Sequence, residues 1–438
     1  MSKILYWSVT VAVAGFLFGF DTAVISGADQ SIQTLWQTSP LFHGVFVMSS
    51  ALWGTVLGAI FGNLPCDRLG RKYTLILIGV LYLLSALGSA LAPDPYTFAI
   101  MRFIGGVGVG ISSIAVPAYI SEIAPAAIRG RLVATYQFQI VFGILIAFVS
   151  NFFLAGAITE DWRLMLGVEA LPALVYLLMI LKAPESPRWL ILHKGDSEQA
   201  LKIFTSLGAP EAEARETLNA VQTASKSNQN DSLFQKHYRL PVLLAVLIAV
   251  FNQLSGINFI IYYAPRVFSL AGLDESSALL STAGVGLVNL FFTMLGLALI
   301  DKLGRKLLMY VGSAGYILSL ATVSWAFYSD ISGFTVVLAI FVFIASHAIG
   351  QGAVIWVFIA EIFPNNVRSR GQSLGSSTHW VFAAGITLIM PLVLSTFSPV
   401  TVFSFFTISM CLQLLFVKFM MPETKGRTLE DVSTALTD

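Results

Sequence analysis

Twelve long apolar runs constrain the fold of this chain more than any other feature. A helix needs about 20 mainly apolar residues to cross the hydrocarbon core of a bilayer. Of the 438 residues, 56% are hydrophobic and 11% are charged, whereas about 25% of the residues of a soluble domain are charged. Most of the surface therefore cannot face water, and the sequence predicts an all-α protein that crosses the membrane many times.

The apolar runs form two groups of six, separated by one long polar segment. We expect halves at residues 1–183 and 239–421, a cytoplasmic helical linker at 184–238 and a short tail at 422–438. The predicted spans are 5–27, 43–65, 73–92, 96–120, 131–155, 163–183, 239–268, 276–300, 306–328, 334–360, 371–396 and 400–421.

Positive charge is distributed unevenly between the loops. With the N-terminus placed inside, 22 of the 25 Lys and Arg residues fall in or beside cytoplasmic segments, and only Arg102, Arg163 and Arg266 remain. Cytoplasmic loops are enriched in Lys and Arg. The sequence therefore predicts a multi-pass protein of the cell membrane, inner or plasma membrane, with both termini cytoplasmic.

Three short landmarks occur twice, in the same order. The copies are DRLGRK from Asp67 with DKLGRK from Asp301, residues 122–131 with 361–370, and residues 184–185 with 422–423. A repeat of this length makes the two halves structural copies of each other. Paired copies around a solute site are the usual construction of a secondary transporter.

Carboxylates and arginines lie together in these landmarks, at helix ends predicted to be cytoplasmic. Arginine pairs with carboxylates in a fork-shaped geometry, so we hypothesise that such pairs close the cytoplasmic side while the solute site faces outward. Basic loops that only set the topology are the alternative, which three matched pairs make weaker. The predicted gate residues are Asp67, Arg71, Glu122, Arg129, Glu185, Asp301, Arg305, Glu361, Arg368 and Glu423.

These motifs give the chain a family resemblance over nearly its whole length. The doubled charged loop, PESPRWL from Pro184, PETKGR from Pro422 and NQLSGINFIIYYAP from Asn252 are similar to signatures of the sugar porter branch of the major facilitator superfamily. The resemblance implies two pseudo-symmetric six-helix bundles that rock to expose a central site to each side in turn. The pattern is most similar to bacterial sugar–proton symporters and animal facilitative glucose transporters.

Three ionisable residues lie at similar depth in the first half. Asp21, Arg102 and Glu169 are predicted to lie ~8–11 Å below the outer boundary, where an unpaired charge costs at least about 2.5–3.5 kcal/mol. Movement of Arg102 relative to Asp21 would change the proton affinity of that acid. We hypothesise that Asp21 loads a proton outside and releases it inside; a static salt bridge is the alternative. The resemblance agrees, since proton-coupled sugar porters have Asp here and uniporters tend to have Asn.

Amides are the main polar groups in the middle of the predicted spans. A carboxamide both donates and accepts hydrogen bonds, as a sugar hydroxyl does, so amides suit an uncharged polyol. A single intramembrane amide can also serve only to join two helices. The resemblance assigns sugar binding to Gln137, Gln253, Asn258, Asn289 and Trp356; the wider predicted set adds Asn252, His379 and Trp380.

Three departures from the family pattern leave the sugar open. Asn252 stands where the family usually has Gln, and GQGAVIW before Trp356 lacks prolines, which puts the usual bend of the tenth span in doubt. His379 stands where the family tends to have Gln or Asn, and we interpret it as either a sugar contact or a satisfied interior residue. Trp380 is interpreted as a packing residue or a sugar contact; an indole can lie against the C–H face of a sugar ring.

The leading interpretation is a symporter that imports a monosaccharide, hexose or pentose, with a proton. A facilitative uniporter, a sugar sensor, a polyol transporter and a drug–proton antiporter are the alternatives. The sequence has no P-loop, metal-ligand cluster or nucleophile–base arrangement, so neither an enzyme nor a cofactor is expected. We expect a sugar, the proton and the lipid bilayer as partners, no nucleic acid, and a functional monomer.

Overall fold

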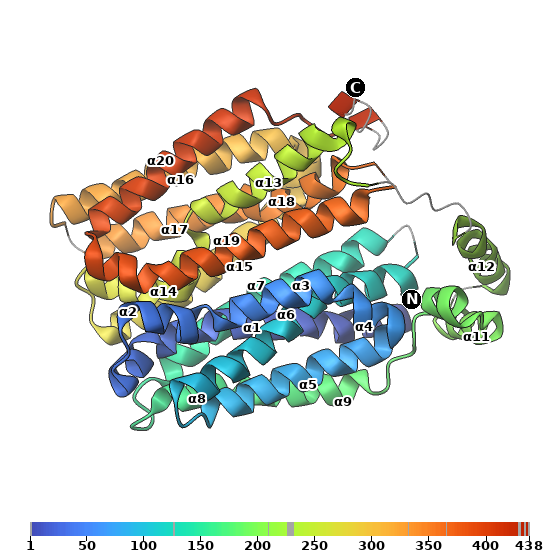
Figure 1. Cartoon of the computed structure of the whole chain (residues 1–438), viewed down its shortest axis with the longest axis horizontal. Coiled ribbons are helices and arrows are strands. Elements are labelled where there is room, and N and C mark those ends of the chain that lie inside the picture. The colour runs from blue at the N-terminus through green and yellow to red at the C-terminus, as the bar shows by residue number, and fades with distance from the viewer. Residues whose placement is uncertain are drawn as a thin grey trace. The chain divides into compact units, whose positions relative to one another are not determined.

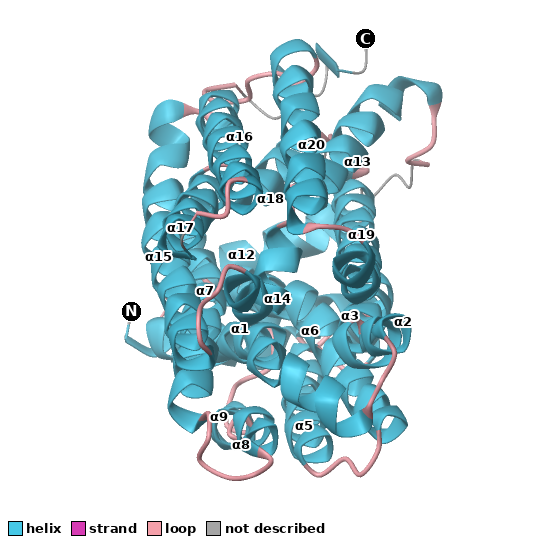
Figure 2. Cartoon of the chain, turned by 90° about the vertical axis from the view of Figure 1, so that its left-hand side faces the viewer, coloured by secondary structure: helices cyan, strands magenta, loops and turns pink. Residues whose placement is uncertain are grey.

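The structure is a computed structural model that describes residues 2–125, 128–208, 210–225, 232–331, 333–364, 366–427, 431–432 and 435–436. Throughout these ranges every regular element is a helix (Figures 1 and 2). The predicted all-α fold is therefore confirmed. Parts of the predicted linker and tail, at 226–231 and in the last eleven residues, lie outside the described residues.

The first half consists of long helices with two interruptions. Its elements are α1 (Ser2–Trp36), α2 (Pro40–Phe42), the π-helix η1 (His43–Met48), α3 (Ser50–Phe61), α4 (Asn63–Arg68), α5 (Arg71–Ala90), α6 (Pro95–Ile123), α7 (Arg129–Leu154), α8 (Asp161–Gly167) and α9 (Ala170–Ile180). The linker contains α10 (Pro187–Trp189), η2 (Leu190–Lys194), α11 (Ser197–Ser206), α12 (Glu211–Ser225) and η3 (Lys236–Tyr238). The short surface helices expected there are present.

The second half repeats this plan. Its elements are α13 (Arg239–Leu254), α14 (Ile257–Leu270), α15 (Glu275–Leu303), α16 (Arg305–Tyr328), α17 (Gly333–Ile349), α18 (Gln351–Glu361), α19 (Arg368–Thr396) and α20 (Pro399–Phe419). Side-chain caps start several of them: Asp274 accepts from the backbone N–H of Ser277, and Ser398 from that of Thr401. Such caps satisfy backbone donors that a helix leaves unpaired at its start.

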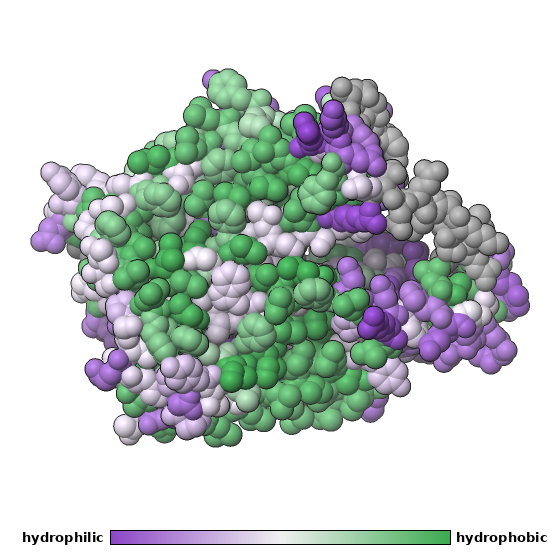
Figure 3. Space-filling model, in the orientation of Figure 1, coloured by the Kyte–Doolittle hydropathy of each residue, from purple (hydrophilic) through white to green (hydrophobic). Residues whose placement is uncertain are grey.

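The described residues provide eleven spans that are long and apolar enough to cross a membrane. The bent pair Pro40–Met48 and Ser50–Phe61, with an angle of 42° at its break, supplies a twelfth if it counts as one span. Large apolar side chains stand exposed along these helices, for example Leu171 (66% exposed) and Leu318 (68%). Figure 3 shows this hydrophobic surface on the helices and hydrophilic residues near their ends. Such exposure is expected where the surrounding medium is lipid.

The chain forms two compact units. The first comprises Met1–Asp21, Trp53–Ile144 and Leu166–Gln229, and the second comprises Thr22–Leu52, Leu145–Met165 and Asn230–Asp438. The second unit therefore contains the whole second half together with parts of α1, η1 and α7. Close packing explains this: a Cβ on Gly44 would overlap the carbonyl oxygen of Leu388, and one on Gly286 would lie 2.9 Å from the Cα atom of Leu145.

Two spans of the second half are broken at glycines. Gly256, with φ +86°, separates α13 from α14. Gly350, with ψ −101°, separates α17 from α18, so the tenth span breaks although the prolines of the family are missing. A Cβ on Gly350 would lie 2.9 Å from the Cα atom of Gly312. The close crossing of these backbones, rather than proline, accounts for the break.

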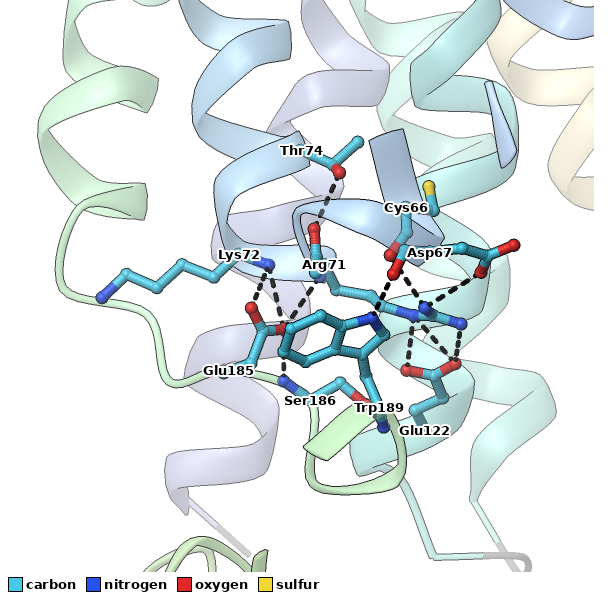
Figure 4. A network of polar contacts seen from close by, with 10 residues as sticks. Cys66, Asp67, Arg71, Lys72, Thr74, Glu122, Glu185, Ser186 and Trp189 are labelled. Atoms are coloured by element: carbon cyan, nitrogen blue, oxygen red, sulfur yellow. Dashed lines mark hydrogen bonds and ion pairs between the residues drawn. The ribbon is translucent and has the colours of Figure 1, made fainter. Parts of the chain in front are cut away.

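The repeated landmarks form one hydrogen-bonded network in each unit. In the first unit, Arg71 donates to Glu122 (Nη2–Oε1, 2.9 Å) and lies 3.4 Å from an Asp67 oxygen (Figure 4). Glu185 accepts from the backbone N–H groups of Arg71 (2.9 Å) and Lys72 (3.1 Å) at the start of α5. A carboxylate there also favours the positive end of the helix dipole.

The second unit reproduces these contacts at the matching positions. Arg305 donates to Glu361 at 2.7 Å and lies 3.1 Å from Asp301. Glu423 accepts from the backbone N–H groups of Arg305 and Lys306, each at 3.0 Å. The repeat in the sequence is thus a repeat of individual hydrogen bonds.

The other two arginines predicted to belong to the gate, Arg129 and Arg368, contact the main chain. Arg129 donates to the carbonyl oxygen of Ala124 (3.5 Å), and Arg368 donates to that of Phe363 (3.1 Å). These acceptors are themselves counterparts in the repeat. Both arginines therefore help to close the turn that precedes their own helix.

The two matched carboxyls differ in their proton affinity. Burial raises the pKa of Glu185 above its usual value, against the backbone N–H groups that it accepts from. Burial acts in the same direction on Glu423, but the N–H groups of Lys425, Lys306, Arg305 and Thr424 outweigh it and lower the pKa of that carboxyl. Glu423 thus favours the ionised form more than Glu185 does.

Glu423→Gln is expected to lower the thermal unfolding temperature at neutral pH, with a difference from wild type that shrinks toward about pH 4, where carboxyls take up protons. A lowered folded-state pKa gives stability that is present at neutral pH and lost as the pH falls. Glu185→Gln is the matched control and should cost less at neutral pH, because its raised pKa disfavours the ionised form. Equal losses in the two variants at every pH would contradict this assignment.

Candidate functional site

Asp21, Arg102 and Glu169, predicted from sequence as a group, meet in the first unit. The Arg102 Nη1 atom donates to the Asp21 carboxylate, and Nη2 donates to the Asp21 backbone carbonyl oxygen at 2.8 Å. The Glu169 carboxyl group lies near enough to Asp21 to interact with it electrostatically. Each of the three residues is at most 2% exposed. They come from α1, α6 and the break between α8 and α9, so only the folded bundle brings them together.

The chemistry of this group limits its proton content. Two ionised acids beside one guanidinium would carry a net negative charge. With one proton on the acids, the group is electrically neutral. Because unpaired charge is costly inside a membrane, the site has a physical reason to hold one proton.

Amides of the second unit form a second polar cluster. Gln253 is its centre: its Nε2 atom donates to Asn252 Oδ1 at 3.0 Å, and its Oε1 atom accepts from Asn258 Nδ2 at 2.9 Å. Gln253 Nε2 also lies 3.2 Å from the His379 ring nitrogens. The break at Gly256 places α13 and α14 so that three amides of one segment share one site. The structure thus brings four of the predicted sugar-site residues into contact.

The amide cluster continues into residues that the sequence analysis missed. Asn252 donates to Gln351 Oε1 at 3.4 Å, Gln351 to Gln413 Oε1 at 2.9 Å, and Gln413 to the Ser313 hydroxyl at 2.8 Å. Gln351, Gln413 and Ser313 are fully buried. The sequence did contain a feature that points to these residues, because each of two apolar spans contains a glutamine. Gln351 follows the break at Gly350. In this position it contacts Asn252, whose side chain is shorter than that of the Gln usual in the family.

His379 lies between the two predicted tryptophans. Its ring centroid is 5.0 Å from that of Trp356 and 4.8 Å from that of Trp380. Trp356 is 38% exposed, whereas Trp380 is 7% exposed. Trp356 is therefore only partly covered by the protein, and Trp380 is mainly a packing residue.

Two predicted amides remain, one in each unit. Asn289, in α15, accepts from the Thr293 hydroxyl one turn away at 3.3 Å. Gln137 lies in α7 within the first unit, and is half-buried. Each unit therefore contains at least one of the predicted sugar-site amides.

A further polar cluster in the second unit was not predicted. Asp29 accepts from the His43 Nε2 atom at 2.8 Å, and its Oδ2 atom lies 2.8 Å from Arg266 Nε. Arg266 also donates to Gln33 at 2.6 Å. Asp29 and His43 are at most 1% exposed. The sequence feature that pointed to this cluster was Arg266, one of the three cations that the predicted topology does not place in or beside cytoplasmic segments.

No group of three or more His, Cys, Asp or Glu residues suited to a metal ion occurs in the described part of the chain. The polar chemistry consists of the Asp21, Arg102 and Glu169 group in the first unit and, in the second unit, the amides and the cluster of Asp29, His43 and Arg266. The group in the first unit can bind a proton, and the amides can bind an uncharged polyol.

Comparison with known proteins agrees with this chemistry. The family model described as "Sugar (and other) transporter" matches residues 7–436. The arabinose-proton symporter of Bacillus subtilis (strain 168) is 35% identical over 442 residues, covering 99% of this chain and 95% of that protein. The D-xylose-proton symporter of Escherichia coli (strain K12) is 34% identical, covering 98% of this chain and 95% of that protein.

Solved structures match over the same length. The inward-open conformation of the xylose transporter XylE from E. coli has a TM-score of 0.88 and 31% identity, with 99% of each chain covered. The proton:xylose symporter XylE bound to 6-bromo-6-deoxy-D-glucose has a TM-score of 0.80 and 32% identity, again with 99% of each chain covered. The chain belongs to the sugar porter family of the major facilitator superfamily, and it is a transporter rather than an enzyme.

Proposed function

We propose that this protein imports a monosaccharide together with a proton by alternating access, with Asp21 as the proton carrier. The observation that supports this most is the buried group in which Arg102 binds Asp21 beside Glu169. Relatives over the full length include symporters for arabinose and xylose. A carboxyl that is paired in one conformation and unpaired in another changes its proton affinity between the two.

The exchange of partners by Arg102 would couple the proton to the conformation. When Arg102 pairs with Asp21, that acid is stabilised in its ionised form. When Arg102 leaves Asp21, the buried acid is stabilised by a proton. Glu169 is the second partner within reach, so Arg102 need not lose all compensation for its charge during the exchange.

We place the sugar at the amides around Gln253. Gln253, Asn252 and Asn258 already form hydrogen bonds with one another, and they can transfer these bonds to sugar hydroxyls at little cost. The partly exposed indole of Trp356 suits the C–H face of a sugar ring. Relatives of similar identity are named for arabinose, xylose and glucose, so a panel of these sugars is the natural test.

We further propose that both termini face the cytoplasm and that a single chain in the bilayer is the functional unit. The landmark networks of the two units then lie at the cytoplasmic ends of their helices. Arg71 and Arg305 each hold three helix ends together through carboxylates of their own unit. These networks give the rigid ends that a cytoplasmic gate requires.

Asp21→Asn is expected to abolish accumulation of sugar driven by a proton gradient, while exchange of labelled for unlabelled sugar continues. The amide keeps the shape of the side chain but cannot carry a proton at working pH. The measurement uses proteoliposomes with the inside more alkaline than the medium. If the mutant still concentrates sugar, Asp21 is not the proton carrier. If the wild type never concentrates sugar against its gradient, the protein is a facilitator.

Gln253→Leu is expected to raise the KM for sugar about 10-fold or more, since each lost hydrogen bond costs ~0.5–1.5 kcal/mol and Gln253 offers several. Initial uptake rates over a range of sugar concentrations provide the measurement. Gln199→Leu, on the exposed face of α11, makes the same change outside the membrane and should leave the KM unaltered. An unchanged KM in Gln253→Leu would move the sugar site elsewhere.

Glu122→Gln and Glu361→Gln are expected to shift the protein toward the state that is open to the cytoplasm, because each removes a carboxylate partner of Arg71 or Arg305. A single cysteine, Thr135→Cys in α7, in a background without Cys66 and Cys411, should then react faster with a thiol reagent added from the cytoplasmic side. Labelling rates that match those of the parent would argue against a latch.

A further inference from the structure

A row of buried hydroxyl groups lies in the first unit near the ionisable group. The Tyr82 hydroxyl lies 3.4 Å from the Ser112 hydroxyl, which lies 3.2 Å from the Tyr136 hydroxyl. Tyr82 and Ser112 are fully buried, and Tyr136 is 7% exposed. The three residues come from α5, α6 and α7, so the row crosses three helices and ends at the side chain with some access to solvent.

The row begins beside the acids. Ser85 is three residues from Tyr82 in α5, on the same side of the helix. Gly105 packs against this point: a Cβ there would lie 2.3 Å from the Ser85 hydroxyl and 3.4 Å from an Asp21 carboxylate oxygen. The charges of Asp21 and Glu169 both act on the Tyr82 hydroxyl. The hydroxyls thus continue from the ionisable group along α5 toward its Arg71 end.

Several polar atoms at the start of the row have no hydrogen-bond partner among the described residues. They are the hydroxyls of Ser85 and Ser89 and the Oε1 atom of Glu169. All three residues are buried. Buried polar atoms of this kind commonly bind an ordered water. One water among these atoms would connect Glu169 to the hydroxyl row.

The arrangement of the phenols distinguishes this row from ordinary packing. The Tyr119 hydroxyl donates to the carbonyl oxygen of Pro184, and the Tyr176 hydroxyl donates to that of Leu75. Each of those hydrogen bonds ends on a backbone oxygen, which cannot pass a proton on. Tyr82 and Tyr136 instead meet at a hydroxyl, which both accepts and donates.

We propose that Tyr82, Ser112 and Tyr136 form the path by which the proton leaves the Asp21–Glu169 group toward the Arg71 end of α5. A carboxyl O–H bond breaks as its proton passes to water at Ser85. Each hydroxyl of the row then accepts one proton and releases its own to the next oxygen, and Tyr136 releases a proton to solvent. Every hydroxyl is neutral before and after the transfer. Ser112 also donates to the Val109 carbonyl oxygen at 2.8 Å, so its proton must rotate away from that oxygen once per cycle.

This inference rests on the proposed proton symport, and its test separates the two. The variants are Tyr82→Phe, Ser112→Ala and Tyr136→Phe, and the control is Tyr176→Phe, which removes the same oxygen from the same unit. Each full-length protein is placed in proteoliposomes with whichever of D-xylose, L-arabinose and D-glucose the wild type takes up fastest. Two rates are measured: sugar-dependent alkalinisation of the medium, and exchange of labelled sugar at equal pH, which needs no net proton transfer.

The relay variants are expected to slow sugar-dependent proton uptake about 100-fold or more, the lower end of the range for a missing proton-transfer group, with exchange close to that of wild type. Tyr176→Phe should keep both rates. Proton uptake at the wild-type rate in all three relay variants would overturn the path, and so would an equal loss in the control. A wild type that moves sugar without protons would instead refute the symport itself.

A second measurement needs no variant and covers the case in which a substitution prevents folding. Transfer along hydroxyls should make wild-type proton uptake slower in D2O than in H2O, by a larger factor than sugar exchange. Equal factors for the two rates would count against the relay.

Discussion

The pairing of one buried guanidinium with Asp21, beside a second acid, is the interaction that most constrains the first unit. Arg102 cannot lose its charge, and it is only 2% exposed. Asp21 supplies both a carboxylate and a backbone oxygen to it. Any conformational change that moves α1 relative to α6 must therefore give Arg102 another anion or give Asp21 a proton. Coupling follows from this electrostatic requirement.

The two units have matching helix ends but differ in the polar groups within their spans. At the helix ends, the contacts of Arg71 with Glu122 and Glu185 reappear as those of Arg305 with Glu361 and Glu423. Within the spans, the first unit has the Asp21, Arg102 and Glu169 group and a row of hydroxyls, whereas the second has a chain of amides and the separate cluster of Asp29, His43 and Arg266. Ionisable groups and hydroxyls suit a proton, and amides suit an uncharged polyol. Duplication thus accounts for the matched helix ends, and the polar groups within the spans have diverged.

Polar residues within the spans are linked into networks rather than isolated. Asn252 reaches Ser313 through Gln351 and Gln413, across four helices. Each buried amide has partners because an unpaired polar group costs free energy in an apolar environment. The same requirement fixes the orientation of Gln253, which contacts Asn252, Asn258 and His379. A preorganised set of amides would lose little entropy if a sugar replaced these contacts, as we propose.

Much of the architecture was set by the sequence alone. Apolar run length predicted the spans, because the bilayer fixes how long a helix must be. The repeat predicted the matched helix ends, since identical spacings of Asp, Arg and Glu produce identical contacts. The grouping of Asp21, Arg102 and Glu169 followed from equal depth in one half, because charges at one level in lipid must compensate each other.

Tertiary structure alone decided the rest. The break at Gly350 follows from the close approach of Gly312, which no local pattern encodes. The cluster of Asp29, His43 and Arg266, the contact of Gln351 with Asn252 and the meeting of two tyrosines at Ser112 each join residues from different helices. Sequence spacing gives the depth of a residue and the face it occupies on its own helix. Which faces meet is decided by packing between helices, and those meetings create the sites.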